Sequence, residues 1–291
     1  MRATCALLAI FPIAVHAGTI TVNDDRSNAI VLAAPAQRIV ALAPSLTELV
    51  FAAGAGSRLV GVARFSDYPS AAKNIPLIGD ASRIDLERVL SLAPDLIVGW
   101  KSGNQIADLD RLEQLGFKVY VAEPDTLTAI SKTLRSLGAL AGTTDAAQRA
   151  TFEFERGIAA LRAQYGTRRT VPVFYEIWHM PLMTVNGRHV ISDVIRLCGG
   201  ENVFASVPVL APVVSLESVL AAHPAGIIGG SSATTPEEFA GQWRRYASFA
   251  QLAGVPTLYV HPDLIQRQSP RILYGARVIC EQLESIRSNH R

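Results

Sequence analysis

The chain has 291 residues, 49% of them hydrophobic, and it carries 27 Lys and Arg against 25 Asp and Glu. This length suits two domains of ordinary size, and the composition allows each of them to bury a sizeable core. Because the charges nearly balance and no basic stripe stands out, we expect neither nucleic acid nor another polyanion as a partner.

The N-terminus has the pattern of a cleavable secretory signal peptide at residues 1–17. Arg2 provides a positive start, and Ala6–Val15 is an apolar run too short to span a bilayer. A small-x-small site ends at Ala17, so the mature chain is expected to start near Gly18. The alternative is a buried N-terminal strand or helix. No later segment has the roughly eighteen uninterrupted apolar residues of a spanning helix, so we expect no insertion into a membrane.

Apolar β-branched runs alternate with helical patterns along the rest of the chain, which indicates an α/β fold. In the first half, Ser45-x-x-Glu48 predicts a capping box at the start of a helix, and Asp85 can N-cap another. The strands predicted here are 38–42, 59–63, 95–100 and 118–122, and the helices are 45–54, 85–92, 105–115 and 127–140.

Residues 144–166 carry no strand signal and instead form one helical stripe of apolar side chains. We predict a helix of about six turns, capped by Thr144 and ended by Gly166, as the only substantial connection between two lobes. The second half repeats the alternation, with strands predicted at 172–177, 227–228 and 257–260 and helices at 190–197, 215–222, 236–252 and 270–287. The predicted domains are an N-terminal lobe 18–142, a connecting helix 143–167 and a C-terminal lobe 168–291.

An internal repeat relates the two halves. The segment 85–99 returns at 215–229 with seven of fifteen positions identical. We therefore expect two similar lobes with parallel-type sheets flanked by helices and a ligand cleft between them. The repeat also places Glu87 and Glu217 at equivalent positions in the first turn of a helix. These carboxylates either compensate the helix dipole or dock a basic partner, and the repeat does not decide between the two.

Two cysteines, Cys198 and Cys280, remain once the signal peptide is removed. An even number in an exported chain favours a disulfide, which would close a loop of 82 residues and fasten the last helix to the second lobe. The alternative is a pair of buried thiols. Their spacing does not suit a cysteine-based metal site.

No catalytic motif emerges from the sequence. The chain lacks a Gly-x-Ser-x-Gly elbow, a Walker A loop and a His-Glu-x-x-His pair, and its histidines are scattered. We therefore expect a binding protein, not an enzyme, with neither a resident cofactor nor a metal.

Large planar and charged side chains follow several predicted strands, at the sheet edge where ligands of parallel α/β folds sit. Aromatic rings there can face a large apolar ligand, and Asp or Arg can fix its polar edge. The alternative for the two tryptophans in this set is packing in the core or between the lobes. The candidate ligand-binding residues are Phe65, Tyr68, Trp100, Trp178, His179, Asp263 and Arg267.

With these features assembled, the chain resembles the periplasmic substrate-binding proteins of ABC importers in which a helix joins two lobes. This family takes up cobalamin, haem and iron-siderophores, and the resemblance is strongest to its cobalamin-binding members. The stretches that carry it are PSLTELVFAAG (44–54), SDYP (66–69), LERVLSLAPDLIVGW (86–100), LCGGENVF (197–204) and SPRI (269–272).

The resemblance implies a periplasmic monomer that carries a corrinoid between its lobes and delivers it to the permease dimer of an ABC importer in the inner membrane. It places the family's two permease-docking glutamates on Glu87 and Glu217, and its disulfide on Cys198 and Cys280.

Of the family's cobalamin-contacting positions, Trp100, Asp263 and Arg267 match. A contacting tyrosine is Phe65 here, and the loss of two pocket tryptophans leaves a roomier pocket, which Trp178 and its neighbour His179 can partly fill. The alternative on the same fold is haem or an iron-siderophore as the ligand. Haem would require a Tyr or His as axial ligand.

Overall fold

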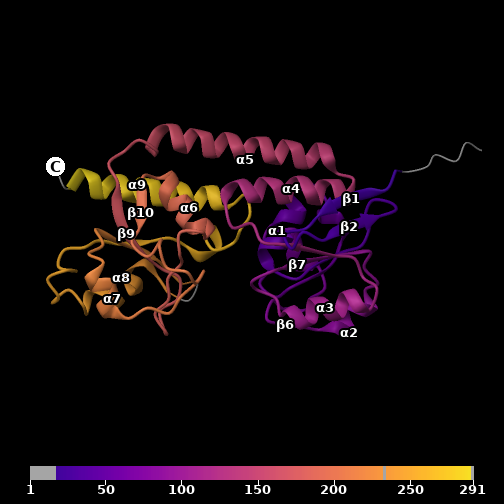
Figure 1. Ribbon diagram of the computed structural model, residues 1–291, viewed down its shortest axis with the longest axis horizontal. Coiled ribbons are helices and arrows are strands. Elements are labelled where there is room, and N and C mark those ends of the chain that lie inside the picture. The colour runs from indigo at the N-terminus through magenta and orange to yellow at the C-terminus, as the bar shows by residue number, and fades with distance from the viewer. Residues whose placement is uncertain (1–17, 232–233, 290–291) are drawn as a thin grey trace, which may run out of the picture.

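The structure is a computed structural model that describes residues 18–231 and 234–289. Two α/β lobes lie side by side along the long axis, and helix α5 (Thr144–Tyr165) runs across both of them (Figure 1). The signal peptide predicted at residues 1–17 lies outside the described residues. Within those residues, every helix is too short or too polar to cross a membrane.

The N-terminal lobe is built on a parallel sheet with the strand order β4-β3-β7-β8. Most of its strand residues are apolar and buried on both faces, as a parallel sheet covered by helices requires. The strands are β3 (Ile39–Ala41), β4 (Leu59–Val62), β7 (Leu96–Trp100) and β8 (Val119–Ala122). The helices are α1 (Pro44–Ala52), α2 (Leu86–Ser91), α3 (Ile106–Gln114) and α4 (Leu127–Ala141).

Two short antiparallel hairpins of this lobe were not predicted. The first pairs β1 (Ile20–Asn23) with β2 (Ala29–Leu32), and the second pairs β5 (Gly79–Asp80) with β6 (Arg83–Ile84). None of these four strands is a continuous buried apolar run of the kind that marks the strands of a parallel sheet in a sequence.

The C-terminal lobe repeats the plan with a parallel sheet in the order β10-β9-β11-β12. Strand β10 was not predicted, and α8 ends at Arg244, well before the predicted position 252. The chain continues from there in turns that bring Leu252 into a buried cluster with Trp243. The strands are β9 (Val171–Glu176), β10 (Gly200–Asn202), β11 (Gly226–Gly229) and β12 (Thr257–Tyr259). The helices are α6 (Val190–Leu197), α7 (Leu216–Ala221), α8 (Pro236–Arg244) and α9 (Ile272–Asn289).

The internal repeat is visible in the backbone. Helices α2 and α7 have the same length, and each is capped by the side chain of the residue before it, Asp85 or Ser215. Each helix is followed by a non-glycine residue with a positive φ, 43° at Ala93 and 46° at His223, and then by a buried strand. The two halves of the sequence therefore fold as two versions of one unit.

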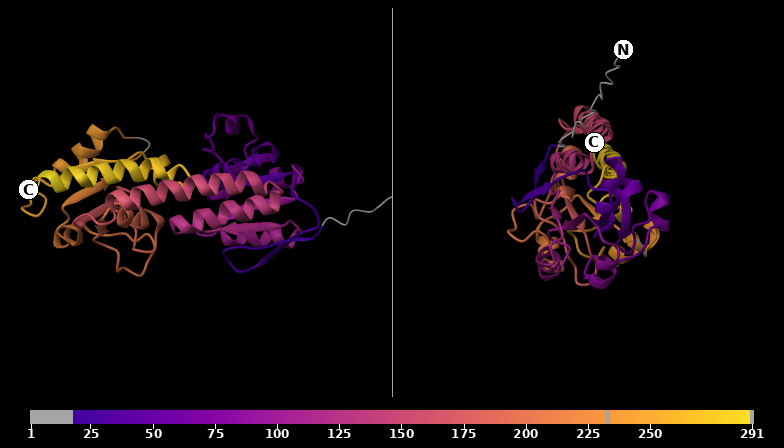
Figure 2. Two further views of the ribbon diagram at one scale, coloured as in Figure 1. Left: turned by 90° about the horizontal axis from the view of Figure 1, so that it is seen from above. Right: turned by 90° about the vertical axis from the view of Figure 1, so that its right-hand side faces the viewer.

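The lobes are joined by packing as well as by α5. Helices α4, α5 and α9 extend along the long axis of the molecule (Figure 2). One core cluster runs beneath them through both lobes and includes Leu134, Phe154 and Ile279. In addition, the Leu127 backbone N–H donates to Asp193 Oδ2 at 2.9 Å. The connection is thus more extensive than the single helix predicted, which favours small opening motions over a wide hinge closure.

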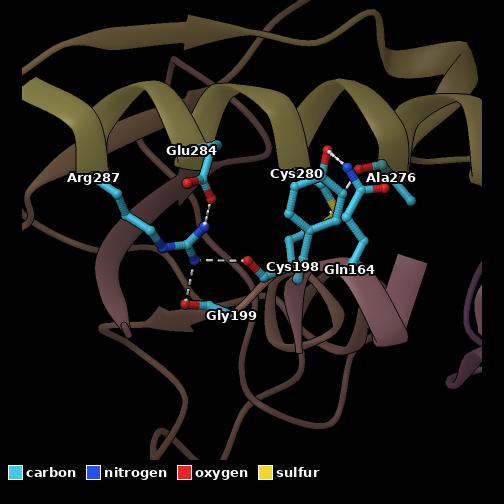
Figure 3. Close-up of a disulfide and its surroundings, with 8 residues drawn as sticks. Gln164, Cys198, Gly199, Ala276, Cys280, Glu284 and Arg287 are labelled. Carbon is cyan, nitrogen blue, oxygen red and sulfur yellow. Dashed lines mark hydrogen bonds and ion pairs between the residues drawn. A yellow bond between two sulfur atoms is a disulfide. The ribbon is translucent and has the colours of Figure 1, made fainter. Parts of the chain in front are cut away.

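A disulfide between Cys198 and Cys280 joins the end of α6 to α9, as predicted (Figure 3). Beside it, Arg287 Nη2 donates to the carbonyls of Cys198 and Gly199 at 2.8 and 2.9 Å. Arg287 also pairs with Glu284, at 3.0 Å between Nη1 and Oε2. On chain-entropy reasoning, closing a loop of 82 residues stabilises the fold by on the order of 4 kcal/mol.

Candidate ligand cleft

Two adjoining cavities, which we call the cleft, open at the carboxyl ends of the strands. The larger has a volume of about 370 Å³ and is lined by both lobes. The smaller, of about 280 Å³, belongs to the C-terminal lobe and shares Pro262 and Gln266 with the larger. Residues lining the larger cavity are Pro44, Ser45, Phe65, Asp67 and Trp100 from the N-terminal lobe, and Pro262, Asp263, Gln266, Arg267 and Gln268 from the C-terminal lobe.

Two aromatic side chains form the N-terminal side of the cleft. Trp100 is the last residue of β7, and its backbone N–H donates to Asn104 Oδ1 at 2.7 Å while its indole N–H donates to Glu123 Oε1 at 3.4 Å. Phe65 follows β4 at a φ of 67° and is 70% exposed. The backbone thus holds a large phenyl ring in the open, available to a ligand.

The C-terminal side of the cleft is formed by the loop that follows β9. Trp178 and Met180 are 60% and 78% exposed, and both line the smaller cavity. The indole N–H of Trp178 donates to the Met180 carbonyl at 2.8 Å, which orients the ring. His179 lies between them in the chain and lines the same cavity. The structure therefore brings both predicted tryptophans to the cleft, and the core-packing alternative does not hold for Trp178.

Glu176 lies directly before this loop, and its side chain contacts the loop residue His179. It is the last residue of β9, is buried, and accepts a hydrogen bond from the indole of Trp243 at 2.6 Å. Its other oxygen lies 3.2 Å from His179 Nδ1. Burial raises the pKa of Glu176, and the neighbouring His179 and Trp243 act in the opposite direction.

An ion-pair cluster joins the lobes beside the cleft; its members are Glu48, Asp67, Asp263, Arg267 and Arg271. Arg267 Nη2 lies 2.8 Å from Asp263 within its own lobe, and its Nη1 lies 2.7 Å from Asp67 and 3.0 Å from Glu48 in the other lobe. Arg271 Nη1 lies 2.7 Å from Glu48. The predicted pair of Asp263 and Arg267 therefore does two things, since it lines the cleft and also holds the lobes together.

The charges in this cluster stabilise one another. Burial alone would raise the pKa of Asp67, but the hydrogen bond and charge of Arg267 lower it below its ordinary value. Burial alone would lower the pKa of Arg267, but its bonds to Asp67 and Glu48 outweigh that effect and raise it. Both groups remain ionised at neutral pH.

Glu48 has a different role from the one predicted. Helix α1 begins at Pro44, its N-cap Ala43 has no side-chain cap, and no capping box forms. Instead the Glu48 side chain is buried and accepts from Ser269 Oγ at 2.5 Å, in addition to its two arginine partners. A signal was present in the sequence, because a carboxylate in an otherwise apolar helical run requires a buried partner.

Tyr68 does not join the other predicted ligand-binding residues. The Arg271 guanidinium carbon lies 3.9 Å from the centroid of its ring. Tyr68 also lines a separate cavity of about 780 Å³, between α1, α5 and the start of α9, on the far side of Glu48. We call this the rear cavity. Asp67, which sequence reasoning missed, takes the place of Tyr68 in the cleft.

Glu87 and Glu217 are both exposed and lie on helices α2 and α7. The two helices sit at the lower edge of the two lobes, on the side opposite α5 (Figure 1). Hydrogen bonds from its own backbone N–H and from Ser215 lower the pKa of Glu217. Neither carboxylate forms an ion pair with any residue that the structure describes.

The chemistry available in the cleft is that of binding. It offers aromatic faces from both lobes and one Asp–Arg pair that can fix a polar edge. Among the described residues, no group of three or more His, Cys, Asp or Glu side chains is placed to hold a metal ion.

Comparison with known proteins agrees with this geometry. Residues 39–250 match the family model described as periplasmic binding protein. The vitamin B12-binding protein of Vibrio campbellii is 33% identical over 253 residues, which cover 87% of this chain and 91% of that protein. The vitamin B12-binding protein of Yersinia pestis is 35% identical over 251 residues, covering 86% and 88%.

Solved structures give the same result. The periplasmic vitamin B12-binding protein of Vibrio cholerae superimposes with a TM-score of 0.79 at 33% identity and covers 87% of this chain and 98% of its own. A periplasmic haem-binding protein of Pseudomonas aeruginosa shares the fold, with a TM-score of 0.72 at 23% identity, covering 84% and 91%. The chain belongs to the periplasmic binding protein family.

Proposed function

We propose that this protein binds a corrinoid, cobalamin or a close relative, in the cleft and delivers it to the permease of an ABC importer from the periplasmic side. The observation that carries the proposal is that aromatic side chains of both lobes line the cleft, Trp100 and Phe65 in the larger cavity and Trp178 in the smaller cavity beside it. A corrin ring is a large, flat, mostly apolar ligand, and aromatic faces on both sides of a cleft suit such a shape. The similarity to vitamin B12-binding proteins supports the same ligand.

Polar groups at the base of the cleft suit the periphery of the ring. Corrinoids carry amide side chains around the macrocycle, which donate and accept hydrogen bonds. Asp263 and Arg267 present charged groups in the cleft, and Gln266 and Gln268 add amides beside them. Because Asp263 and Arg267 hold each other at 2.8 Å, they enter the complex already oriented.

Docking on the permease is proposed to use Glu87 and Glu217. They are exposed, occupy equivalent places in the two lobes, and lie at the same edge of the molecule (Figure 1). A monomer thereby presents one carboxylate per lobe, which matches a permease dimer carrying one basic site per subunit. Dipole compensation in the first turn of α2 and α7 is compatible with this role, because the carboxylates remain free for a partner.

Corrinoid-dependent growth of cells that lack this chain tests the proposal. The chain is supplied with Glu87→Ala and Glu217→Ala together, and we expect growth at limiting cyanocobalamin to be lost while purified protein still binds the vitamin. The matched control is the double change Asp145→Ala and Glu153→Ala, which removes two exposed carboxylates from α5 on the opposite side. Full growth with the first pair would contradict docking through these glutamates.

Haem is the second candidate ligand. His179 in the cleft is an available imidazole, and haem-binding proteins share the fold. An absorbance titration with haemin separates the two candidates, because an imidazole on the iron would shift the Soret band.

A further inference from the structure

The surroundings of His179 differ from those of a histidine that only fills space in the core. It lies on the exposed loop after β9, and its side chain is 28% exposed. Its Nδ1 nevertheless lies within hydrogen-bond distance of the buried carboxylate of Glu176. That carboxylate is itself fixed by the buried indole of Trp243 through its other oxygen. Two successive hydrogen bonds thus fix the ring of a residue on a loop.

The first bond also determines the tautomer of the ring. When Glu176 is ionised it only accepts, so at 3.2 Å the Nδ1 of His179 carries the proton and donates it to Glu176. The lone pair of the neutral imidazole is then left on Nε2. Histidines that bind metals in proteins use this arrangement, with the second ring nitrogen donating to a carboxylate that orients the ring and raises its basicity.

The second nitrogen of the ring has no hydrogen-bond partner among the described residues. The ring lines the smaller cavity beside Trp178. The other histidine near the cleft differs, because His261 Nδ1 accepts from the Asp263 backbone N–H at 3.2 Å and is used as a cap. His179 is therefore the better-placed ligand of the two.

We propose that His179 Nε2 binds the metal at the centre of the cargo by displacing an exchangeable axial ligand. This inference rests on the proposed corrinoid function and makes it more specific. In the step, the Nε2 lone pair forms a bond to cobalt(III) and the coordinated water leaves as water. No electron is transferred, and the Nδ1 proton stays on the hydrogen bond to Glu176. The protein then favours corrinoids whose upper ligand is weakly held.

Which corrinoid binds more tightly depends on whether the upper ligand of its cobalt can be replaced by an imidazole. Aquacobalamin carries a water that an imidazole can replace, whereas the cyanide of cyanocobalamin is held too firmly. The two forms share the same corrin ring and differ only in the upper ligand, so any difference in affinity between them isolates the metal bond. We expect aquacobalamin to bind at least about tenfold more tightly than cyanocobalamin. A tenfold change is the smallest effect on metal affinity expected when the group that orients a metal ligand is lost.

The test is an absorbance titration of the mature protein with aquacobalamin and, separately, with cyanocobalamin. The expected result is a shift of the visible bands of aquacobalamin on binding and no shift for cyanocobalamin. His179→Ala should abolish the shift and make the two affinities equal. Glu176→Gln should retain a shift but weaken aquacobalamin binding alone, because it removes the carboxylate that orients the ring.

The matched control is His261→Asn, which removes the other nearby imidazole and retains an acceptor for the Asp263 N–H. We expect it to leave the shift intact. If both corrinoids bind with equal affinity and without any shift, the inference is overturned and the corrinoid function stands. If neither corrinoid binds, the proposed function itself fails.

Discussion

A single buried carboxylate, Glu48, explains how the two lobes meet beside the cleft. It accepts from Arg267, Arg271 and Ser269, all of the opposite lobe. The two arginine side chains are only 12% and 17% exposed, so water cannot replace the carboxylate. Breaking such a group leaves positive charge in a poorly solvated place, which costs more than the ion pair itself contributes.

Replacing Glu48 by Gln is therefore expected to lower the free energy of unfolding by about 3 kcal/mol. The expected loss lies at the low end of the range for breaking a buried ion pair, because Arg267 keeps its ion pairs with Asp67 and Asp263. Urea denaturation followed by circular dichroism measures the change. The matched control is Glu155→Gln, which breaks an ion pair with Arg135 in which both side chains are about half exposed, and should cost no more than about 0.5 kcal/mol. Equal losses for the two variants would contradict the bridging role of Glu48.

Individual residues of the site were predictable where a strand end or a resemblance identified them. Trp100, Trp178, Asp263 and Arg267 all reach the cleft. Tyr68 did not, because the loop after β4 turns its ring beneath Arg271 and into the rear cavity. Such a reversal depends on the contact between lobes, which a local pattern does not contain.

At the scale of single elements, α6 depends on an unusual cap. Its N-cap is His189, whose Nδ1 accepts from the Ile191 backbone N–H at 3.2 Å. Only a neutral imidazole can accept there, and burial lowers the pKa of His189 to about 4. Since Cys198 follows α6 directly and forms the disulfide with Cys280, this cap positions an element that is covalently joined to α9.

Stability should consequently fall as the solution is acidified. An unfolded chain protonates its histidine near pH 6.5, whereas folded His189 resists protonation down to a pH of about 4. Between these values the unfolded state binds the extra proton, so the stabilisation present above pH 6.5 is lost as the pH falls towards 4. We expect His189 to contribute on the order of 2 kcal/mol to this loss, less than the full shift implies because the ring is partly exposed.

The variant His189→Asn checks this attribution. Asn caps helices well and does not titrate, so the free energy of unfolding should match the wild type at pH 5 or exceed it, and depend less on pH between 7 and 5. Denaturant titrations at the two pH values provide the measurement. An unchanged pH dependence in the variant would assign the effect to other groups.

Helices and strands were predictable where the sequence shows a long apolar stripe or a continuous apolar run. The long apolar stripe of α5 and the buried runs of β7 and β8 were found within a residue or two. The β1–β2 hairpin and β10 were missed because they lack the continuous buried apolar run of β7 and β8. Strands β1 and β2 alternate exposed residues with buried or half-buried ones over only four positions, and β10 is the polar segment Gly-Glu-Asn. The early end of α8 depends on the packing of Leu252 against Trp243, which is tertiary information.

For the whole molecule, the repeat and the resemblance together predicted two lobes and a cleft, and the structure confirms both. What the sequence did not contain is the continuous core beneath α4, α5 and α9 or the ion-pair cluster beside the cleft. The ion pairs between the lobes join residues 200 or more positions apart and arise only when the lobes assemble. They make the cleft a largely preformed site, and so a small change of shape on binding is expected.

The measurement that tests the central claim most directly is a calorimetric titration of the purified protein with cyanocobalamin, with haemin in parallel. The account predicts one-to-one binding of cyanocobalamin that is weakened about tenfold or more by Trp100→Ala, since a stacked aromatic contributes on the order of 1–1.5 kcal/mol beyond its area. Haemin binding without any cyanocobalamin binding would contradict the corrinoid assignment.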